Sequence, residues 1–361
     1  MNTSPTPVAF LRGEEPSIAT PHVWLHRYAV AVACATLCLI IAGAMVTSTG
    51  SGLSVPDWPT TYGQNMFTYP PSRWVGGIFY EHGHRLIAST VGLMAVVLAV
   101  WLWRCEPRRW MRVLGGAAVL AVIAQGVLGG LTVLYLLPTP ISVLHGCLAQ
   151  TFFCITIAIA VFTSPGWLRN PSRVVTPGRF GVRGWCCLAV GVVFLQLILG
   201  AVMRHTGSGR AVLDFPLAYG QWFPDLSATA VENYNIDRVW EFQLPAVMAE
   251  QIAYHMTHRI GAVVVTIVLV WTVVTVLRRH AGMVELKRPA VAALFLLVTQ
   301  LGLGAWTVWS GKDAWVTSAH VAVGAATLGC VWILALRACR RLAAAPRGAA
   351  SSAVSAQAVG L

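Results

Sequence analysis

Eight long apolar stretches constrain this chain more than any other feature. A helix needs roughly 20 apolar residues to cross the hydrocarbon core of a bilayer. The stretches that meet this length are about 28–47, 85–103, 113–136, 141–162, 185–204, 257–277, 290–309 and 316–337. The composition agrees, because 57% of the 361 residues are hydrophobic and only 11% are charged. Such a composition lies outside the range of soluble domains and predicts an all-α integral membrane protein with eight transmembrane helices.

The basic residues are distributed unevenly between the two sides of the predicted membrane. If the N-terminus is cytoplasmic, 18 of the 25 basic residues face the cytoplasm, together with only four of the 13 acids. This follows the positive-inside rule, so we predict that both termini are cytoplasmic and that the chain does not bind nucleic acid. The first 27 residues contain Glu14 and Glu15 and no apolar core, unlike a cleaved signal or transit peptide. A bacterial plasma membrane is the simplest location.

The chain contains two copies of one unit. GAMVTSTGSGLSVPDWPTTYGQ at 43–64 aligns without a gap with GAVMRHTGSGRAVLDFPLAYGQ at 200–221, at an offset of 157 and with 12 identities in 22 positions. EHGHR at 81–85 matches HMTHR at 255–259. The outer loops that contain or follow these segments are expected to fold as caps over the helices, since long loops in compact bundles more often serve function than simple connection.

Each copy holds four of the eight apolar stretches. QGVLGGLTVL from Gln125 matches QLGLGAWTVW from Gln300, and His145 matches His320, all at an offset of 175. Four helices is an even number, so the copies share one orientation, unlike inverted transporter repeats. We therefore predict two duplicated four-helix bundles in parallel orientation. The predicted divisions are a cytoplasmic tail (1–27), an N-terminal bundle (28–162), a cytoplasmic linker (163–184), a C-terminal bundle (185–337) and a second cytoplasmic tail (338–361).

Each copy also places one histidine at the outer start of its second helix and one at the outer start of its fourth. These are His84 and His145 in the first copy and His258 and His320 in the second. Two imidazoles that enter a bundle core at the same depth suit axial ligation of a haem iron. A lone membrane histidine more often bonds a neighbouring helix, but recurrence in both copies favours ligands. Zinc or copper is the competing interpretation, although two imidazoles leave zinc short of four ligands.

Residues next to the predicted ligands indicate different roles for the two copies. Arg85 and Arg259 follow a ligand and are candidates to pair with a haem propionate, with interfacial snorkelling as the alternative. Glu81 takes the position of His255, three residues before the ligand and on the same helical face. A carboxylate there would hold water, pass protons or stabilise charge, whereas the alternative is a helix-start acid. We predict chemistry at Glu81 and electron transfer alone in the second copy; His82 lies off this face and is interpreted as solvated or as a neighbour of the site.

With these motifs, the sequence resembles the heme A synthase family over about 28–337. The resemblance rests on EHGHR, LHG at 144–146, HMTHR, AH at 319–320 and the loop GSGLSVPDWPTTYG. It implies conversion of haem O to haem A by two successive hydroxylations of one ring methyl, which ends as a formyl group. In that family the N-terminal bundle binds the substrate haem and the C-terminal bundle a permanent haem b. These sites correspond to Glu81, His84 and His145 in the first bundle and to His258 and His320 in the second.

The resemblance also implies partners and leaves one alternative open. Haem O, membrane lipid, haem O synthase and oxidase assembly factors are the expected partners, and the electron donor is unassigned. Some relatives carry a cysteine pair in the first outer loop, whereas residues 48–80 contain none here, which argues against a thiol-based step. The alternative is a di-haem b-type cytochrome that relays electrons without modifying haem. All four ligands are predicted near the outer face, which is a poor arrangement for electron transfer across the bilayer.

Overall fold

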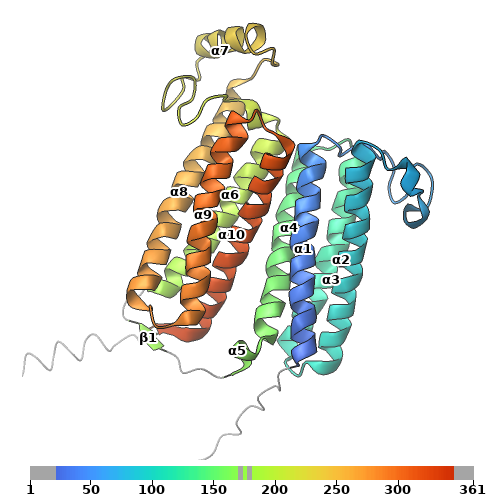
Figure 1. Cartoon of the computed structure of the whole chain (residues 1–361), viewed down its shortest axis with the longest axis vertical. Helices are drawn as coiled ribbons and strands as arrows, with labels where there is room; N and C mark the ends of the chain where they lie inside the picture. Colours follow the sequence, from blue (N-terminus) through green and yellow to red (C-terminus); the bar gives the residue numbers. More distant parts are fainter. Residues whose placement is uncertain (1–21, 170–173, 177–180, 345–361) are drawn as a thin grey trace, which may run out of the picture.

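The protein is described by a computed structural model over residues 22–169, 174–176 and 181–344 (Figure 1). Its long helices are α1 (Val23–Ser48), α2 (Gly77–Cys105), α3 (Arg109–Leu134), α4 (Thr139–Thr163), α6 (Val182–His205), α8 (Ala249–Arg279), α9 (Val284–Trp309) and α10 (Ala314–Arg341). All eight are long and apolar enough to cross a membrane. The chain is therefore an all-α multi-pass membrane protein, and the prediction of eight spanning helices is confirmed.

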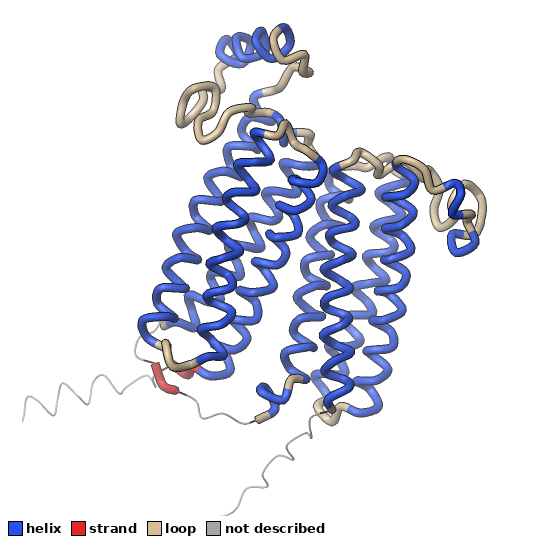
Figure 2. The backbone as a smooth tube through the Cα atoms, in the orientation of Figure 1, coloured by secondary structure: helices blue, strands red, loops and turns tan. Residues whose placement is uncertain are grey.

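The remaining elements are short and lie at the ends of the helices (Figure 2). They are η1 (Met66–Thr68), η2 (Pro71–Arg73), α5 (Pro165–Leu168), β1 (Val174–Thr176), η3 (Ser208–Arg210), α7 (Ala228–Trp240) and β2 (Leu342–Ala344). The two strands are only three residues long and pair in parallel. Helix α7 was not predicted, because its sequence is polar and it lies beyond the end of the second bundle (Figure 1).

Two helices begin well before the apolar stretches that signal them. Helices α2 and α8 start at Gly77 and Ala249, each eight residues ahead of the predicted starts at 85 and 257. A helix satisfies its own backbone hydrogen bonds, so it can continue through polar residues whose side chains find partners. EHGHR and HMTHR consequently lie inside helices rather than at their first residues. His84 and His258 are therefore roughly two turns deep.

The helices form two bundles that stand side by side (Figures 1 and 2). Helices α1 to α4 enclose one core, which includes the fully buried Leu98 and Leu102. Helices α6, α8, α9 and α10 enclose another, which includes Leu269 and Leu328. Large apolar side chains such as Leu93 and Phe295 are exposed on the outside of the bundles, as expected where lipid is the solvent. This arrangement is consistent with a duplicated unit.

The bundles meet where α1 and α4 pack on α6 and α10. Small residues bring α10 close to α4: a Cβ built at Gly329 would stand 2.9 Å from Cδ1 of Ile157. The Trp332 indole N–H donates to the Cys154 carbonyl across this contact at 2.9 Å. Close backbone approach and interhelical hydrogen bonds are the usual means of association between helices in lipid, where apolar burial contributes little.

Candidate functional site

The four predicted histidine ligands lie at the same end of the two bundles. His84 is on α2 and His145 on α4, and the two are close enough to interact electrostatically. His258 is on α8 and His320 on α10, and their ring centroids are 6.5 Å apart. Each pair therefore joins the second and fourth long helices of its own bundle, as the sequence predicts.

The spacing of the second pair fits one iron held between two imidazoles. A bond between a transition metal and a histidine nitrogen is about 2 Å long, which puts the centroids of two opposed rings roughly 6 Å apart. The observed 6.5 Å for His258 and His320 is close to this separation. In the first pair, the buried Nδ1 of His84 has no hydrogen-bond partner among the described residues. Those residues also contain no group of three or more His, Cys, Asp or Glu that could hold a metal ion, so a bis-histidine haem fits better than zinc.

Gln196 on α6 is a functional candidate that sequence reasoning missed. Its side-chain amide nitrogen lies 3.1 Å from Nδ1 of His258 and donates to the His258 carbonyl at 2.8 Å. At the repeat offset of 157, the first copy has Leu39, which offers no such bond. The amide nitrogen is a donor, so these contacts hold the His258 ring and backbone in place. Comparing the copies position by position would have revealed this difference.

The outer loops that follow α1 and α6 have the same internal construction. Asp57 accepts hydrogen bonds from the backbone N–H groups of Tyr62 and Gly63, at 2.7 and 2.8 Å. Asp214 accepts the equivalent bonds from Tyr219 and Gly220, at 2.8 and 2.9 Å. Each aspartate thus closes a tight turn close to the start of the helix that carries the first histidine of its bundle.

Arg85 and Arg259 tie these loops to the helices. The Arg85 guanidinium donates to the carbonyls of Val55, Asp57 and Thr60, at 2.8, 2.7 and 3.1 Å. In the second copy, Arg259 donates to the carbonyls of Asp214 and Leu217, at 2.7 and 2.8 Å. Pairing with a haem propionate stays a prediction for both arginines. Their observed partners are loop carbonyls, and these are separated from the arginines by more than 20 residues of chain.

Glu81 is buried, and both of its carboxylate oxygens are engaged. Oε2 accepts from the Val55 backbone N–H at 2.8 Å, and Oε1 pairs with Arg85 at 2.7 Å. The side chain therefore lies between the helix and the loop that caps it. A buried carboxylate held by one guanidinium and one amide is well placed to keep a negative charge or to exchange a proton. Its catalytic role stays a prediction.

His255, which replaces Glu81 in the second copy, also contacts its loop. Its Nδ1 lies 3.2 Å from the Ser208 carbonyl, and the ring is buried. An imidazole can donate one such bond but brings no permanent negative charge. The two copies therefore share a helix-to-loop tether at this position and differ in its charge.

His82 is fully buried, which corrects the interpretation of this residue as solvated. Its Nδ1 lies 3.1 Å from the Thr61 hydroxyl, and its ring packs against Tyr69 and Trp74 with centroids 5.2 and 4.7 Å away. Helical spacing showed only that His82 faces away from the haem-ligand side. The aromatic segment that covers it comes from the loop, which a helical wheel cannot show.

Arg204, at the end of α6, links the two bundles near the histidines. Its guanidinium donates to the Ala44 carbonyl at 3.0 Å and to the Ser48 hydroxyl, both on α1. The Ser318 hydroxyl on α10 reaches the same Ser48 at 2.9 Å. Arg204 stands where the first copy has Thr47, so only the second copy carries this cation. The arginine in place of a threonine is the feature of the sequence that could have identified Arg204 as a special residue.

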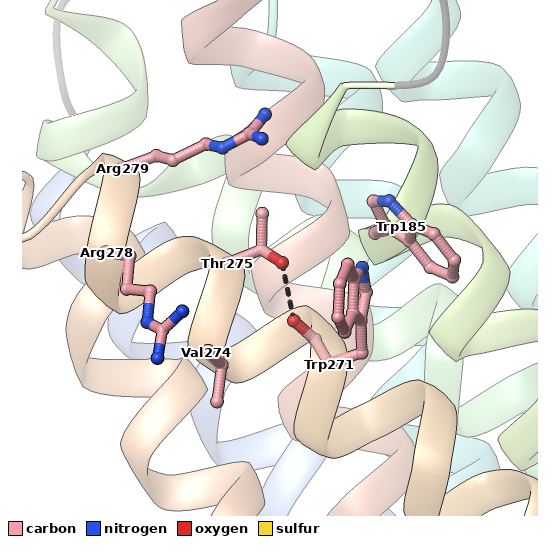
Figure 3. A pocket seen from close by; sticks show the side chains of 6 residues that line it. All are labelled: Trp185, Trp271, Val274, Thr275, Arg278 and Arg279. Carbon is pink, nitrogen blue, oxygen red and sulfur yellow. Dashed lines mark hydrogen bonds between the residues drawn. The ribbon is translucent and has the colours of Figure 1, made fainter.

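A pocket of about 160 Å³ lies at the other end of the second bundle (Figure 3). It is lined by Trp185, Trp271, Val274, Thr275, Arg278 and Arg279. Tryptophan and arginine gather in this way where helices leave the hydrocarbon region. None of the predicted site residues lines the pocket, so it is separate from the histidine pairs.

The sequence is also similar to one family of known proteins. The family model described as COX15-CtaA, cytochrome oxidase assembly protein, matches residues 26–332. Curated relatives named "Heme A synthase" match over most of their length. The relative from Halalkalibacterium halodurans is 25% identical over 79% of this chain and 87% of its own. Those from Shouchella clausii and Geobacillus kaustophilus are 29% and 24% identical, over 70% and 91% of this chain and 78% and 96% of their own.

Proposed function

The chain belongs to the COX15-CtaA family of cytochrome oxidase assembly proteins, and from this premise we propose that it is a heme A synthase. It is a membrane oxidoreductase that converts haem O to haem A for terminal oxidases. Two successive hydroxylations act on one ring methyl, and each replaces one C–H bond with a C–OH bond while two electrons leave the methyl carbon for an external oxidant. The second product, a geminal diol, loses water to leave the formyl group.

The N-terminal bundle is the site of this reaction. His84 and His145 hold haem O as substrate through its iron and fix the ring methyl relative to the protein. Glu81 is the catalytic residue, because it is a buried carboxylate close to the first ligand in sequence and has a proton-exchanging side chain. Arg85 orients this carboxylate through its 2.7 Å ion pair, and is also the candidate partner for a propionate.

The C-terminal bundle holds a permanent haem b between His258 and His320. This bis-histidine haem supplies reversible one-electron chemistry when bound. Gln196 orients the His258 ring, and His255 occupies the tether position without a carboxylate. The second copy therefore exchanges electrons and leaves the oxidation to the first. Arg259 is the candidate propionate partner at this site.

One observation carries the proposal, namely that two histidine pairs lie at the same end of two parallel bundles. A relay across the bilayer needs haems at two depths, whereas two haems held by these histidine pairs would share one depth, which suits exchange between neighbouring sites. The difference between Glu81 and His255 then separates a reacting site from a storage site.

The proposed setting follows from the same arrangement. The protein lies in a bacterial plasma membrane with both termini cytoplasmic and the haem sites near the outer face, as the distribution of basic residues indicates. Haem O synthase and oxidase assembly factors are the proposed partners. The proposed divisions stay 28–162 for the substrate bundle and 185–337 for the haem b bundle, with 163–184 between them.

Extraction and mass analysis of haems tests the function directly. The protein is expressed in cells that contain a haem O source but no other enzyme of this activity, and pigments are extracted from the membranes. Haem A in the extract is the expected result. Accumulation of haem O and haem B alone, with the protein present and holding haem, would contradict the enzyme and favour the di-haem cytochrome.

A further inference from the structure

Each predicted ligand of the second bundle packs against a glycine of the preceding long helix. A Cβ built at Gly200 on α6 would lie 3.0 Å from Cε1 of His258 on α8. A Cβ built at Gly304 on α9 would lie 3.1 Å from Cε1 of His320 on α10. In both cases the nearest atom is the ring carbon between the two nitrogens. The edge of each imidazole therefore packs directly against a glycine of the neighbouring helix, and we call this glycine contact the seat of the ring.

The first bundle repeats this arrangement. A Cβ at Gly43 on α1 would lie 3.0 Å from Cε1 of His84 on α2, and one at Gly129 on α3 would lie 3.3 Å from Cε1 of His145 on α4. Gly43 and Gly200 are related by the repeat offset of 157, and Gly129 and Gly304 by the offset of 175. All four histidines thus meet a glycine in the same way.

Glycine is otherwise unfavourable at these positions. Inside a helix it costs more conformational entropy than alanine, so a helical glycine needs a reason such as close approach of another group. The distances supply that reason, because a methyl group at 3.0–3.3 Å from a ring carbon is inside ordinary contact distance. An alanine would push the imidazole edge by a few tenths of an ångström. The ligating nitrogen is bonded to that carbon and would move with it.

We propose that Gly43, Gly129, Gly200 and Gly304 are positioning residues that seat the four iron-ligating imidazoles, each from the neighbouring helix. This inference rests on the proposed haem ligation and adds what holds each ligand in place. A change at the seat would alter the angle and length of the nitrogen–iron bond, while the histidine itself would still be present. Each glycine should therefore affect the haem of its own bundle.

The test compares full-length wild type with Gly200→Ala and Gly304→Ala. Haem b content per folded protein, reduction potential and the low-spin electron paramagnetic resonance signal are measured. Loss of groups that orient a metal ligand typically weakens metal retention by about 10–100-fold. We expect losses in this range for haem b, together with a changed resonance signal in whatever haem is retained. Gly43→Ala and Gly129→Ala should instead alter binding of added haem O and leave the haem b signals unchanged.

Two neighbouring glycines supply matched controls. Gly191 on α6 and Gly302 on α9 have no atom within 4 Å of a built Cβ. Gly191→Ala and Gly302→Ala make the same chemical change on the same helices, and alanine favours a helix. Both should keep wild-type haem content, potential and resonance signal. Gly304 and Gly302 are only two residues apart. A difference in haem content, potential or resonance signal between Gly304→Ala and Gly302→Ala would therefore be due to the contact between Gly304 and His320.

The outcomes separate this inference from the proposed function. Wild type that binds no haem would remove the proposed ligation itself. Wild type with two bis-histidine haems, beside seat variants indistinguishable from the control variants, would overturn the seats and leave the function intact. If one seat variant fails to fold, the other three still decide, because the expected effect follows the bundle in which the alanine lies.

Discussion

At the scale of single residues, the two halves differ most in the groups around their equivalent histidines. Glu81 puts a carboxylate where the second copy has His255, and Gln196 puts an amide where the first copy has Leu39. Both groups are held by hydrogen bonds of 2.7–3.1 Å, so their positions are defined rather than incidental. The first copy thus has an ionisable group close to His84 in sequence, and the second has a neutral amide bonded to His258. We expect such a difference if the two sites have different tasks.

Glu81→Gln should stop haem A formation and spare haem binding. The glutamine carbonyl can still accept the Val55 N–H, but the negative charge and the exchangeable carboxyl proton are lost. Groups that transfer protons typically contribute about 10²–10⁴-fold to a rate, and we expect a fall of this size in haem A formed per protein. Mass analysis of extracted haem gives the rate, and haem b content confirms the fold. Haem A formation at the normal rate would remove the carboxylate from the mechanism.

Gln196→Leu makes the second site resemble the first. The variant removes the amide bonded to His258 and introduces the side chain that the first copy carries at position 39. Because the amide holds the His258 ring and backbone in place, we expect about tenfold weaker haem b retention and a shifted reduction potential. Redox titration of the purified protein measures both, and haem O binding in the first bundle serves as the internal control. An unchanged potential would mean that the amide serves only helix packing.

At the scale of elements, the loops after α1 and α6 are tied to the first turns of the helices that carry the histidines. Each loop is closed by an aspartate, and its carbonyls are gathered by the arginine that follows a ligand, Arg85 or Arg259. In the second copy, Tyr234 on α7 stacks on Tyr219 with centroids 3.8 Å apart, which docks the extra helix onto the loop. The loops are therefore folded parts of the sites, and they account for the polar residues at the helix starts.

Asp57 makes the first loop sensitive to acid. Burial alone raises the pKa of Asp57, but hydrogen bonds from Thr60, Gly63 and Tyr62 outweigh it and lower the pKa below its ordinary value. A lowered pKa contributes stability above the unfolded value of about 3.9, and this stability is lost as the pH falls through the folded value. We therefore expect hydrogen-exchange protection of residues 49–76 to exceed that of Asp57→Asn at pH 7.

The same comparison at lower pH completes the test. As Asp57 becomes protonated below about pH 4, protection in wild type should fall toward that of Asp57→Asn, whose amide does not titrate. The loop after α6 is the internal control, since Asp57→Asn leaves Asp214 and its bonds in place. A constant ratio of protection between wild type and variant across this range would show that the Asp57 charge does not hold the loop.

At the scale of the whole molecule, the two bundles are joined by polar contacts near the ends that carry the histidine pairs. Arg204 donates to Ala44 and Ser48 of the other bundle, and Ser318 joins the same hydroxyl. Further from this end, Gly329 and Trp332 bring α10 against α4. Hydrogen bonds and close packing are the main forces between helices in lipid, and these contacts reinforce the apolar core that α1, α4 and α10 share between the two bundles.

Arg204→Leu should loosen the two bundles from each other. Hydrogen bonds to charged groups contribute about 1.5–3 kcal/mol, and the leucine also leaves the Ala44 carbonyl without this donor. We expect a lower midpoint of thermal unfolding and separate transitions for the two haem spectra, where wild type shows one. Arg73→Leu, at an exposed position in η2, is the matched control. A single transition at the wild-type temperature would assign cohesion to the α4–α10 contact.

The membrane class, the eight helices and the two histidine pairs could be predicted from the amino-acid sequence. Apolar length, charge bias and internal repetition are properties of the linear chain, and the bilayer converts them directly into helices and orientation. The family resemblance depends on the same motifs. Helix ends were less certain, because EHGHR and HMTHR interrupt the apolar pattern although the helices continue through them.

Which polar groups face the loops and which face the histidines became clear from the folded chain. Arg85 binds carbonyls 25 to 30 residues away, His82 is covered by an aromatic loop segment, and Arg204 reaches the other bundle across more than 150 residues. Such partners are set by the packing of distant segments, since helical periodicity defines a face of a helix and not its neighbour. The glycine seats have the same origin, because a glycine on one helix gains its role only from the imidazole that another helix brings to it.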